Sequence, residues 1–188
     1  MLATAKRLIK EHPPARVTIS LIAREAGVDP ALVRYYFGDR SNLLLAVAES
    51  MLSEFPRPTP GSIEPVAALE HTIRQMARFT NSTKHIHRLM VDELADARSA
   101  DVGRHLGEMN RVAVRDLQEV MGRDAGANLR PVDPALLLVA IVGLFDFFVS
   151  AEPVVRQLVP KGTDMKALAA RYEDFVTDLV LSGIRKRD

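Results

Sequence analysis

The sequence predicts an all-α protein of about nine helices arranged in two domains. Apolar residues recur at helical spacing along almost the whole chain of 188 residues, and no stretch alternates apolar and polar residues as a half-buried strand would. The segment FPRPTPGSIEP, residues 55–65, holds four prolines and a glycine and marks a stiff linker. We therefore expect one domain over residues 1–54, including the helix that leads out of it, and a second over residues 55–188.

The composition is that of a globular protein rather than a disordered chain, because 47% of the residues are apolar and 26% are charged. The chain has no cysteine, which excludes disulfides and cysteine-based zinc sites and suits a reducing cytoplasm, where we expect the protein to work. The first ten residues lack an apolar run long enough for a signal peptide.

The charge distribution points to nucleic acid more than the net charge does. The whole chain carries only +1. Residues 1–40 hold seven lysines and arginines against four acidic residues, or +3, which leaves −2 for the remainder. A modest excess of positive charge at one end is typical of a small DNA-binding domain.

Three helices are predicted before residue 43, and the second and third are joined by a glycine turn. The first covers residues 3–11 and ends at the prolines after His12. The second begins at Thr18 and ends at Gly27, and the third is opened by Asp29-Pro30, a cap followed by a proline at the first helical position. This order is typical of a DNA-reading helix-turn-helix, with an ordinary helical hairpin as the alternative.

The helices after this motif are predicted from apolar spacing and from capping residues. Asp39 caps a helix that runs into the linker, and Asp133-Pro134 opens the most apolar stretch of the chain. Pro153 kinks or divides the helical segment after that stretch, and Thr163 or Asp164 caps the last helix. The remaining helices are expected over residues 66–80, 85–97, 101–121 and 135–149.

Residues 3–45 resemble the N-terminal domain of TetR-type transcriptional regulators. The matching residues are Thr18, Ile22-Ala23, Ala26-Gly27-Val28, Tyr36-Phe37, Asp39-Arg40 and Leu43, together with the sequence ALVRYYFG at residues 31–38. The resemblance implies a three-helix helix-turn-helix DNA-binding domain, followed by a C-terminal helical domain for ligand binding and dimerisation. It also implies a regulator rather than an enzyme.

The resemblance implies roles for individual residues by their position in the motif. The candidates for contacts with base edges are Pro30, Ala31, Leu32 and Tyr35. Ala31 and Leu32 suit the methyl group of thymine, the one apolar feature of the major groove. The candidates for contacts with phosphates are Thr18, Ser20, Tyr36 and Arg40.

Two positions in this stretch, Arg34 and Arg40, differ from the residue that is usual in the family. Arg34 stands where many members have a phosphate-binding tyrosine, and an arginine can bind a phosphate or pair with guanine, so both roles stay open. Arg40 stands where the family usually has a lysine. Phe37 is expected in the core.

The apolar run over residues 135–149 predicts a helix that is covered on more than one side. A membrane span is excluded because the run is shorter than the ~20 residues needed and Asp146 interrupts it. TetR-like proteins pair their last two long helices across a two-fold axis, so we expect a homodimer. The residues expected in its interface are Leu137, Ile141, Leu144, Phe175 and Leu179.

A ligand pocket for a small-molecule effector is implied by the family, and large or flexible apolar residues of several helices could line it. These are Met76, Phe79, Met90, Met109, Leu117, Phe145 and Phe148, each of which could equally be plain core. We expect no cofactor and no metal ion, because His85 and His87 are two residues apart and would point to different sides of a helix.

The sequence thus predicts a ligand-responsive regulator, a repressor in its expected form. It would bind a palindromic double-stranded DNA operator as a homodimer and be released by a small molecule. The alternative is a helical ligand-binding or protein-interaction protein without DNA binding, which the modest charge and the few residues before the first helix motivate. A helical enzyme would need a titratable pair in the pocket, and no phosphate loop or nucleophile motif supports one.

Overall fold

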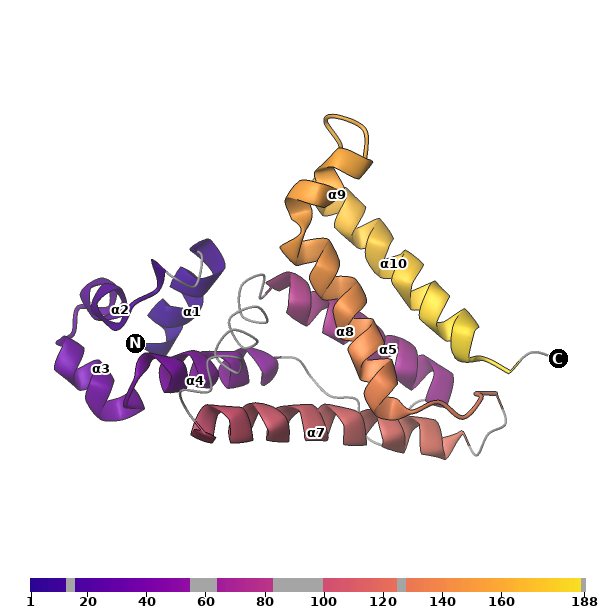
Figure 1. Ribbon diagram of the computed structural model, residues 1–188, viewed down its shortest axis with the longest axis horizontal. Coiled ribbons are helices and arrows are strands. Elements are labelled where there is room, and N and C mark those ends of the chain that lie inside the picture. Colours follow the sequence, from indigo (N-terminus) through magenta and orange to yellow (C-terminus); the bar gives the residue numbers. More distant parts are fainter. Residues whose placement is uncertain (13–15, 55–63, 83–99, 125–127, 187–188) are drawn as a thin grey trace. The chain divides into compact units, whose positions relative to one another are not determined.

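A computed structural model describes residues 1–12, 16–54, 64–82, 100–124 and 128–186 of the chain (Figure 1). Nine helices lie within these residues, which confirms the predicted all-α class. The helix expected over residues 85–97 and the linker residues 55–63 lie outside the described part. The only β-type pairing in the described part is an isolated bridge between Leu129 and Arg185.

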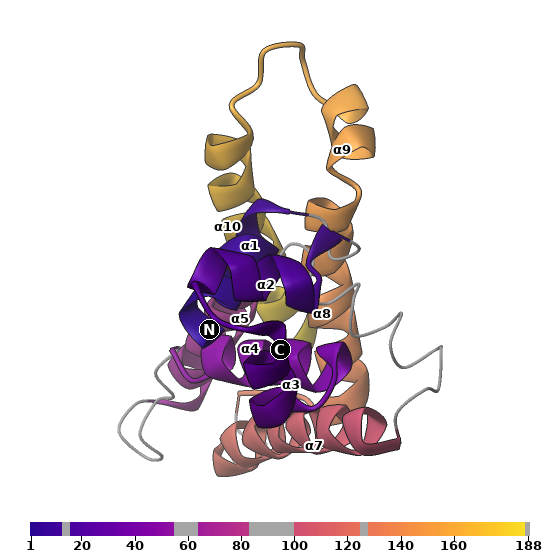
Figure 2. The ribbon, with the colours of Figure 1, turned by 90° about the vertical axis from the view of Figure 1, so that its left-hand side faces the viewer.

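The first four helices are α1 (Leu2–Glu11), α2 (Ile19–Ala26), α3 (Pro30–Phe37) and α4 (Arg40–Leu52). Helix α1 packs against α2 and α4, and α3 packs against the same two helices (Figure 2). Their shared core is built from Leu8, Ile9, Val17, Ile22, Val33, Leu43 and Met51. Helix α3 contributes only Val33 as a buried residue, so most of its side chains point outward.

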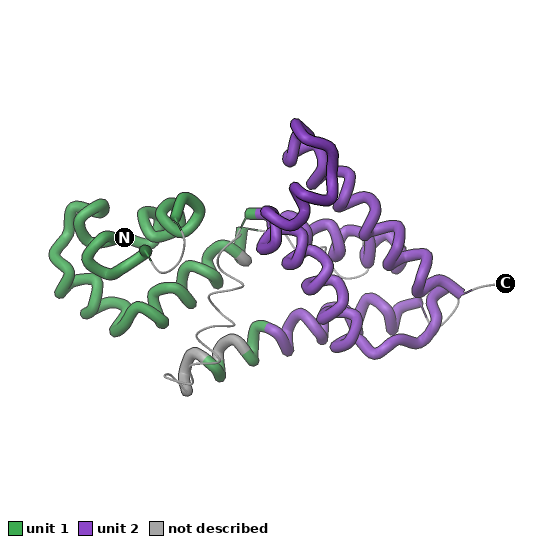
Figure 3. The backbone as a smooth tube through the Cα atoms, turned by 45° about the horizontal axis from the view of Figure 1, so that its top comes forward, with its two compact units in different colours: residues 1–55, 82–109 green, residues 56–81, 110–188 purple. Residues whose placement is uncertain are grey.

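The chain forms two compact units, which Figure 3 distinguishes by colour. One contains residues 1–55 and 82–109, and the other contains residues 56–81 and 110–188. The predicted division into residues 1–54 and 55–188 stays a prediction, and the units differ from it by grouping residues 82–109 with the N-terminal helices.

The second unit contains α5, the later part of α7, and α8 to α10. Their bounds are α5 (Pro65–Ser82), α7 (Ala100–Arg123), α8 (Pro134–Ser150), α9 (Glu152–Leu158) and α10 (Met165–Ile184). Helices α8 and α10 lie side by side, as Figure 1 shows. The core between the helices of this unit includes Leu69, Ile73, Leu117, Ile141 and Val176, none of which is exposed.

The predicted starts of α8 and α10 and the predicted break near Pro153 are confirmed. The Asp133 side chain accepts hydrogen bonds from the N–H groups of Ala135 and Leu136, at 2.8 and 3.3 Å, and Pro134 is the first residue of α8. Pro153 lies in the first turn of α9, which is bent by 81° from α8. Of the two candidates for the last cap, Asp164 accepts the N–H of Lys166 at 2.8 Å.

No single helix of the described part is long and apolar enough to cross a membrane. Helices α8 and α9 together reach that length and composition, but only as a pair with the sharp bend between them.

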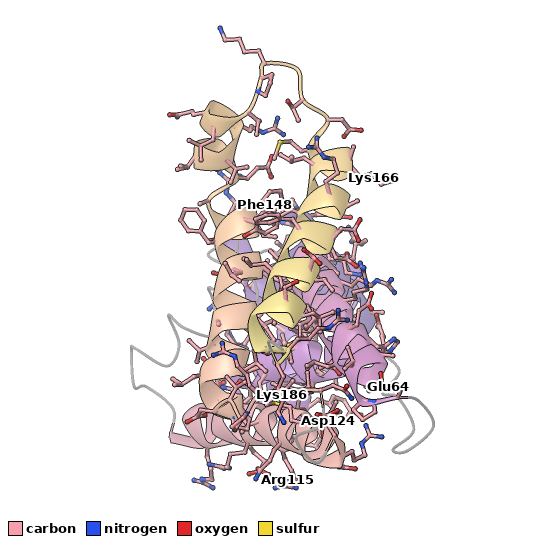
Figure 4. All side chains as sticks on the ribbon, turned by 90° about the vertical axis from the view of Figure 1, so that its right-hand side faces the viewer. Glu64, Arg115, Asp124, Phe148, Lys166 and Lys186 are labelled. Carbon is pink, nitrogen blue, oxygen red and sulfur yellow. The ribbon has the colours of Figure 1, made fainter. Side chains whose placement is uncertain are left out.

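A buried carboxylate fastens the segment after α7 to the end of α10. Asp124 accepts the backbone N–H groups of Leu129 and Asn128, both at 2.8 Å. The N–H of Lys186 donates to the carbonyl of Asn128 at 2.8 Å, and Figure 4 shows Asp124 and Lys186 at the same end of α10. The hydrogen bond from Leu129, followed by those from Asn128, lowers the pKa of Asp124 below its ordinary value of 3.8 although burial opposes this.

Replacing Asp124 by alanine should lower the thermal midpoint by several degrees near neutral pH, because buried N–H groups lose their acceptor. The folded-state pKa lies below the unfolded value of 3.8, so the carboxylate stabilises fully above that value and loses its effect as the pH falls through the folded pKa. The difference between wild type and variant should therefore shrink in acid. Thermal unfolding followed by circular dichroism over a pH series measures it.

The matched control is Glu119→Gln, an exposed carboxylate on α7, which should leave the midpoint near that of the wild type. A difference between wild type and Asp124→Ala that stays constant down to the most acid pH would contradict this role of the carboxylate.

Candidate nucleic-acid interface

The start of α2 has the geometry of a capped helix terminus open to solvent. Thr18 has an extended backbone, with φ −102° and ψ 158°, and its hydroxyl oxygen accepts the N–H of Leu21 at 3.1 Å. Thr18 and Ser20 are both exposed. The buried Ile22 and Ala23 fix the inner face of α2. The first N–H groups of the helix thus face solvent, where a phosphate could accept hydrogen bonds from them.

The turn from α2 to α3 has the predicted chemistry. Gly27 has φ 67°, a left-handed conformation that residues with a Cβ adopt at a cost, and it ends α2. Asp29 caps α3 by accepting the N–H of Ala31 at 2.6 Å, and Pro30 is the first residue of that helix. The end of α2 and the start of α3 are thus each fixed by residues of the turn itself.

Helix α3 presents large side chains to solvent. Tyr35 is 82% exposed, Tyr36 is 64% exposed and Leu32 is 40% exposed. The rings of Tyr35 and Tyr36 meet edge to face, with centroids 5.4 Å apart. Ala31 and Arg34 are exposed as well, and Pro30 is half-buried. A short helix with one buried anchor and so much outward aromatic and aliphatic surface suits insertion into a partner rather than core packing.

Arg40 begins α4 and reaches back to the segment before α2. Its Nε donates a hydrogen bond to the carbonyl oxygen of Val17 at 2.9 Å. The Asp39 side chain caps α4 by accepting the N–H of Asn42 at 2.8 Å, as predicted. The sequence predicts Arg40 at a phosphate, and its neighbourhood at the start of α2 is compatible with that role.

Two further cations lie beside this surface, and the sequence alone assigns them no role. Arg16 and Arg24 are exposed, and they line a shallow pocket of about 280 Å³ together with His12, Leu21 and residues of α1. Arg7, which also lines it, bonds Glu11 at 2.9 Å and Glu25 at 3.1 Å. The packing of α1 on α2 creates this pocket, and the only signal in the sequence is the positive charge of the segment.

The residues expected in a ligand pocket are mostly parts of the core. Leu117 and Phe145 are buried in the main core of the second unit, and Met76 packs against it. Phe148 is buried in a smaller cluster, stacked on Tyr172 with ring centroids 4.3 Å apart, between α8 and α10 (Figure 4). Phe79 and Met109 are half-buried, and Met90 lies outside the described residues.

The predicted interface residues divide into two groups. Leu137 and Ile141 are buried within the chain itself, at 6% and 0% exposure, and Leu144 packs against the same core. Leu137 and Ile141 therefore expose little or no surface in a single chain, and their place in an interface stays a prediction. Phe175 and Leu179 on α10 remain 60% and 50% exposed.

Helix α8 exposes a further apolar stripe, which the sequence pattern does not predict as an interface. Its large residues are Leu136, Val139 and Phe147 on α8, at 67%, 68% and 58% exposure. They recur at intervals of three and eight residues, which places them on one face of the helix. Helices α8 and α10 thus each carry exposed apolar surface in a single chain.

Among the described residues, no three histidine, aspartate or glutamate side chains are placed so that they could hold a metal ion. His85 and His87 lie outside that part.

The N-terminal quarter and most of the remainder of the sequence match two family models. Residues 1–47 match the model of bacterial regulatory proteins of the tetR family, and residues 65–180 match the model of the tetracyclin repressor-like C-terminal domain. The HTH-type transcriptional regulator BetI of Agrobacterium fabrum is 36% identical over 90 residues, which cover 44% of this chain and 44% of that protein. The chain thus aligns with less than half the length of such curated relatives.

Solved structures share the fold over nearly the whole chain. The regulator FadR from Bacillus subtilis, solved with stearoyl-CoA, has a TM-score of 0.65 at 19% identity and covers 97% of each chain. AibR, solved with isovaleryl coenzyme A and operator DNA, has a TM-score of 0.65 at 16% identity, covering 95% of this chain and 94% of its own. At such identities the likeness shows the fold alone.

Proposed function

Since the chain belongs to the tetR family of bacterial transcriptional regulators, we propose that it is a repressor that binds a palindromic DNA operator as a homodimer and leaves it when a small molecule binds. The observation that carries this proposal is the outward surface of α3, where Leu32 and Tyr35 stand clear of the core. Such a regulator works where the chromosome lies, in the cytoplasm.

In this proposal α3 enters the major groove. Leu32 and Tyr35, with Pro30 and Ala31, contact base edges, and Arg34 binds either guanine or a phosphate. Thr18, Ser20, Tyr36 and Arg40 contact the phosphate backbone and fix the position of α3 in the groove. All of these side chains except the half-buried Pro30 and Arg40 are exposed, which supports the assignment.

A homodimer is supported by the apolar surface that α8 and α10 leave uncovered in one chain. Phe147, Phe175 and Leu179 are each at least half exposed. A second copy that covers them gains apolar burial, and a two-fold dimer presents two copies of α3 to two half-sites of a palindrome.

The effector is proposed to bind in the C-terminal helical unit among the apolar residues expected there. The acyl-CoA ligands of FadR and AibR support an effector with an apolar portion, although they belong to those proteins. Binding would shift the position of α4, the helix that leads out of the DNA-binding domain, and change the separation of the two α3 helices. The effector acts only through its different affinity for the two arrangements.

Fragments of genomic DNA and the full-length protein test this function. Fluorescence anisotropy should show binding at low salt whose affinity falls steeply as salt rises, by roughly tenfold or more for each doubling of the salt concentration, because bound phosphates release counterions. A dimer that retains no DNA even at low salt would favour the alternative, a helical ligand-binding or protein-interaction protein.

A further inference from the structure

One hydrogen bond joins the start of α4 to the start of α2. The donor is Nε of Arg40, the first residue of α4, and the acceptor is the carbonyl oxygen of Val17, 2.9 Å away. The two residues are 23 positions apart in the sequence. Val17 is fully buried and stands immediately before Thr18, the cap of α2. The bond therefore holds the backbone at the point where α2 begins.

The start of α2 carries backbone N–H groups that can donate hydrogen bonds to a phosphate. Thr18 uses its hydroxyl oxygen to cap the N–H of Leu21. The N–H groups of Ile19 and Ser20 have no acceptor inside the helix, because the first turn of any helix lacks one. Hydrogen bonds from such groups to a phosphate need donor–acceptor distances near 3 Å, so a small displacement of Val17 and Thr18 weakens them.

The donor of this bond, Arg40, belongs to α4, a helix that is anchored in the core. The side chains of Leu43, Leu44 and Val47 place α4 in the core of the first unit. Near the far end of α4, the ammonium group of Lys6 on α1 donates to the carbonyl of Ser50 at 3.2 Å and also pairs with Glu54. Helix α4 is thus bonded to α1 near its last turn and to the residue before the cap of α2 at its first residue.

We propose that Arg40 is a positioning residue for DNA binding: through Val17 it sets the place of the phosphate-binding end of α2 and couples that end to movements of α4. The inference rests on the proposed function and adds a path by which a change in α4 weakens phosphate contacts. This positioning role is additional to the phosphate contact proposed above for Arg40, because its effect on DNA passes through Thr18 and its neighbours.

The substitution Arg40→Lys distinguishes a positioning role through Val17 from a role that depends only on positive charge. In arginine the donor to Val17 is Nε, inside the side chain, and lysine has a methylene group at that place and its only nitrogen one atom further out. Arg40→Lys therefore keeps the positive charge and removes the donor that Val17 uses. A residue that acts only as a positive charge would tolerate this exchange.

The experiment measures DNA affinity of the full-length protein by fluorescence anisotropy over a salt series. The variants are Arg40→Lys, Arg40→Ala, Thr18→Ala and the double variant Arg40→Lys/Thr18→Ala. Arg78→Lys serves as the control, since it makes the same exchange on α5 in the other unit, where Arg78 lies 3.9 Å from Glu173. Circular dichroism confirms that each variant is folded at the assay temperature.

We expect Arg40→Lys to bind about fivefold more weakly than the wild type or worse with an unchanged salt slope, because a lost hydrogen bond shifts α2 while the charge stays. Thr18→Ala should clearly weaken DNA binding by the otherwise wild-type protein. In the Arg40→Lys background the fold-loss of affinity caused by Thr18→Ala should be at least about threefold smaller, because both changes act on the same contacts. Arg40→Ala should bind no better than Arg40→Lys.

The positioning role would be overturned if Arg40→Lys bound DNA with wild-type affinity. It would also be overturned if the fold-losses of Thr18→Ala and Arg40→Lys simply multiplied in the double variant. Either result would leave the DNA-binding function standing. Failure of the wild type itself to bind DNA would instead refute the proposed function. A folded Arg78→Lys control with the same loss as Arg40→Lys would also overturn the inference.

Discussion

The variant Phe175→Asp is expected to be a monomer that binds a two-fold operator at least about a hundredfold more weakly than the wild type. Phe175 is 60% exposed on α10 in a single chain, beside Leu179 at 50%. In the proposed dimer this ring lies within the interface, so a carboxylate there would be desolvated without a partner. The monomer would keep one α3 helix and lose the gain from binding two half-sites together.

Analytical ultracentrifugation and anisotropy titration measure the two effects. The control Ala170→Asp adds the same charge to an exposed position of α10, five residues earlier and about 140° away around the helix. It should remain a dimer and bind DNA. Phe175→Asp that sediments as a dimer would show that the interface lies elsewhere.

The variants Leu32→Ala and Tyr35→Ala should change which DNA sequences are preferred. Both side chains extend from α3 into solvent, and neither belongs to the core that holds the helix. Loss of one base-edge contact costs about 1–3 kcal/mol on the preferred site, or roughly 5- to 150-fold in affinity, and much less on unrelated DNA. Competition binding with single base-pair variants of the site measures the change.

The stability of these two variants should stay close to that of the wild type, because truncation of an exposed side chain removes little buried surface. An equal loss of affinity on every DNA sequence for Leu32→Ala would contradict a base-reading role and indicate a general effect on α3.

The features of the fold that depend on neighbouring residues are predictable from the sequence. The caps at Asp29 and Asp39, the helix starts at Thr18 and Asp133-Pro134 and the helix end at Gly27 are predicted and confirmed. Each depends on hydrogen bonds or backbone angles within a few residues, so the local sequence contains the information.

The orientation of α8 cannot be predicted in the same way. The helix is apolar on all sides, so its sequence does not distinguish the face toward its own chain from the face left open. The pattern cannot tell that Leu136 is exposed while the neighbouring Leu137 is buried, so the place of Leu137 and Ile141 in the interface stays a prediction. Only the packing of α8 on the rest of the unit decides between the two.

Contacts between residues far apart in the chain also cannot be predicted from the sequence pattern. The bond from Arg40 to Val17 and the attachment of the Asp124 segment to the end of α10 each depend on how separate helices pack. Nothing in the pattern of either segment identifies its partner, so these residues can be placed near a functional surface or in a loop but not given their contacts.

Selection of bound sequences from a random pool of double-stranded DNA tests the central claim most directly. The full-length protein should enrich one palindromic site whose two half-sites lie about one helical turn or more apart, as expected for two α3 helices related by a two-fold axis. No enrichment at low salt, or a single unrepeated site, would contradict the account of a dimeric DNA-binding regulator.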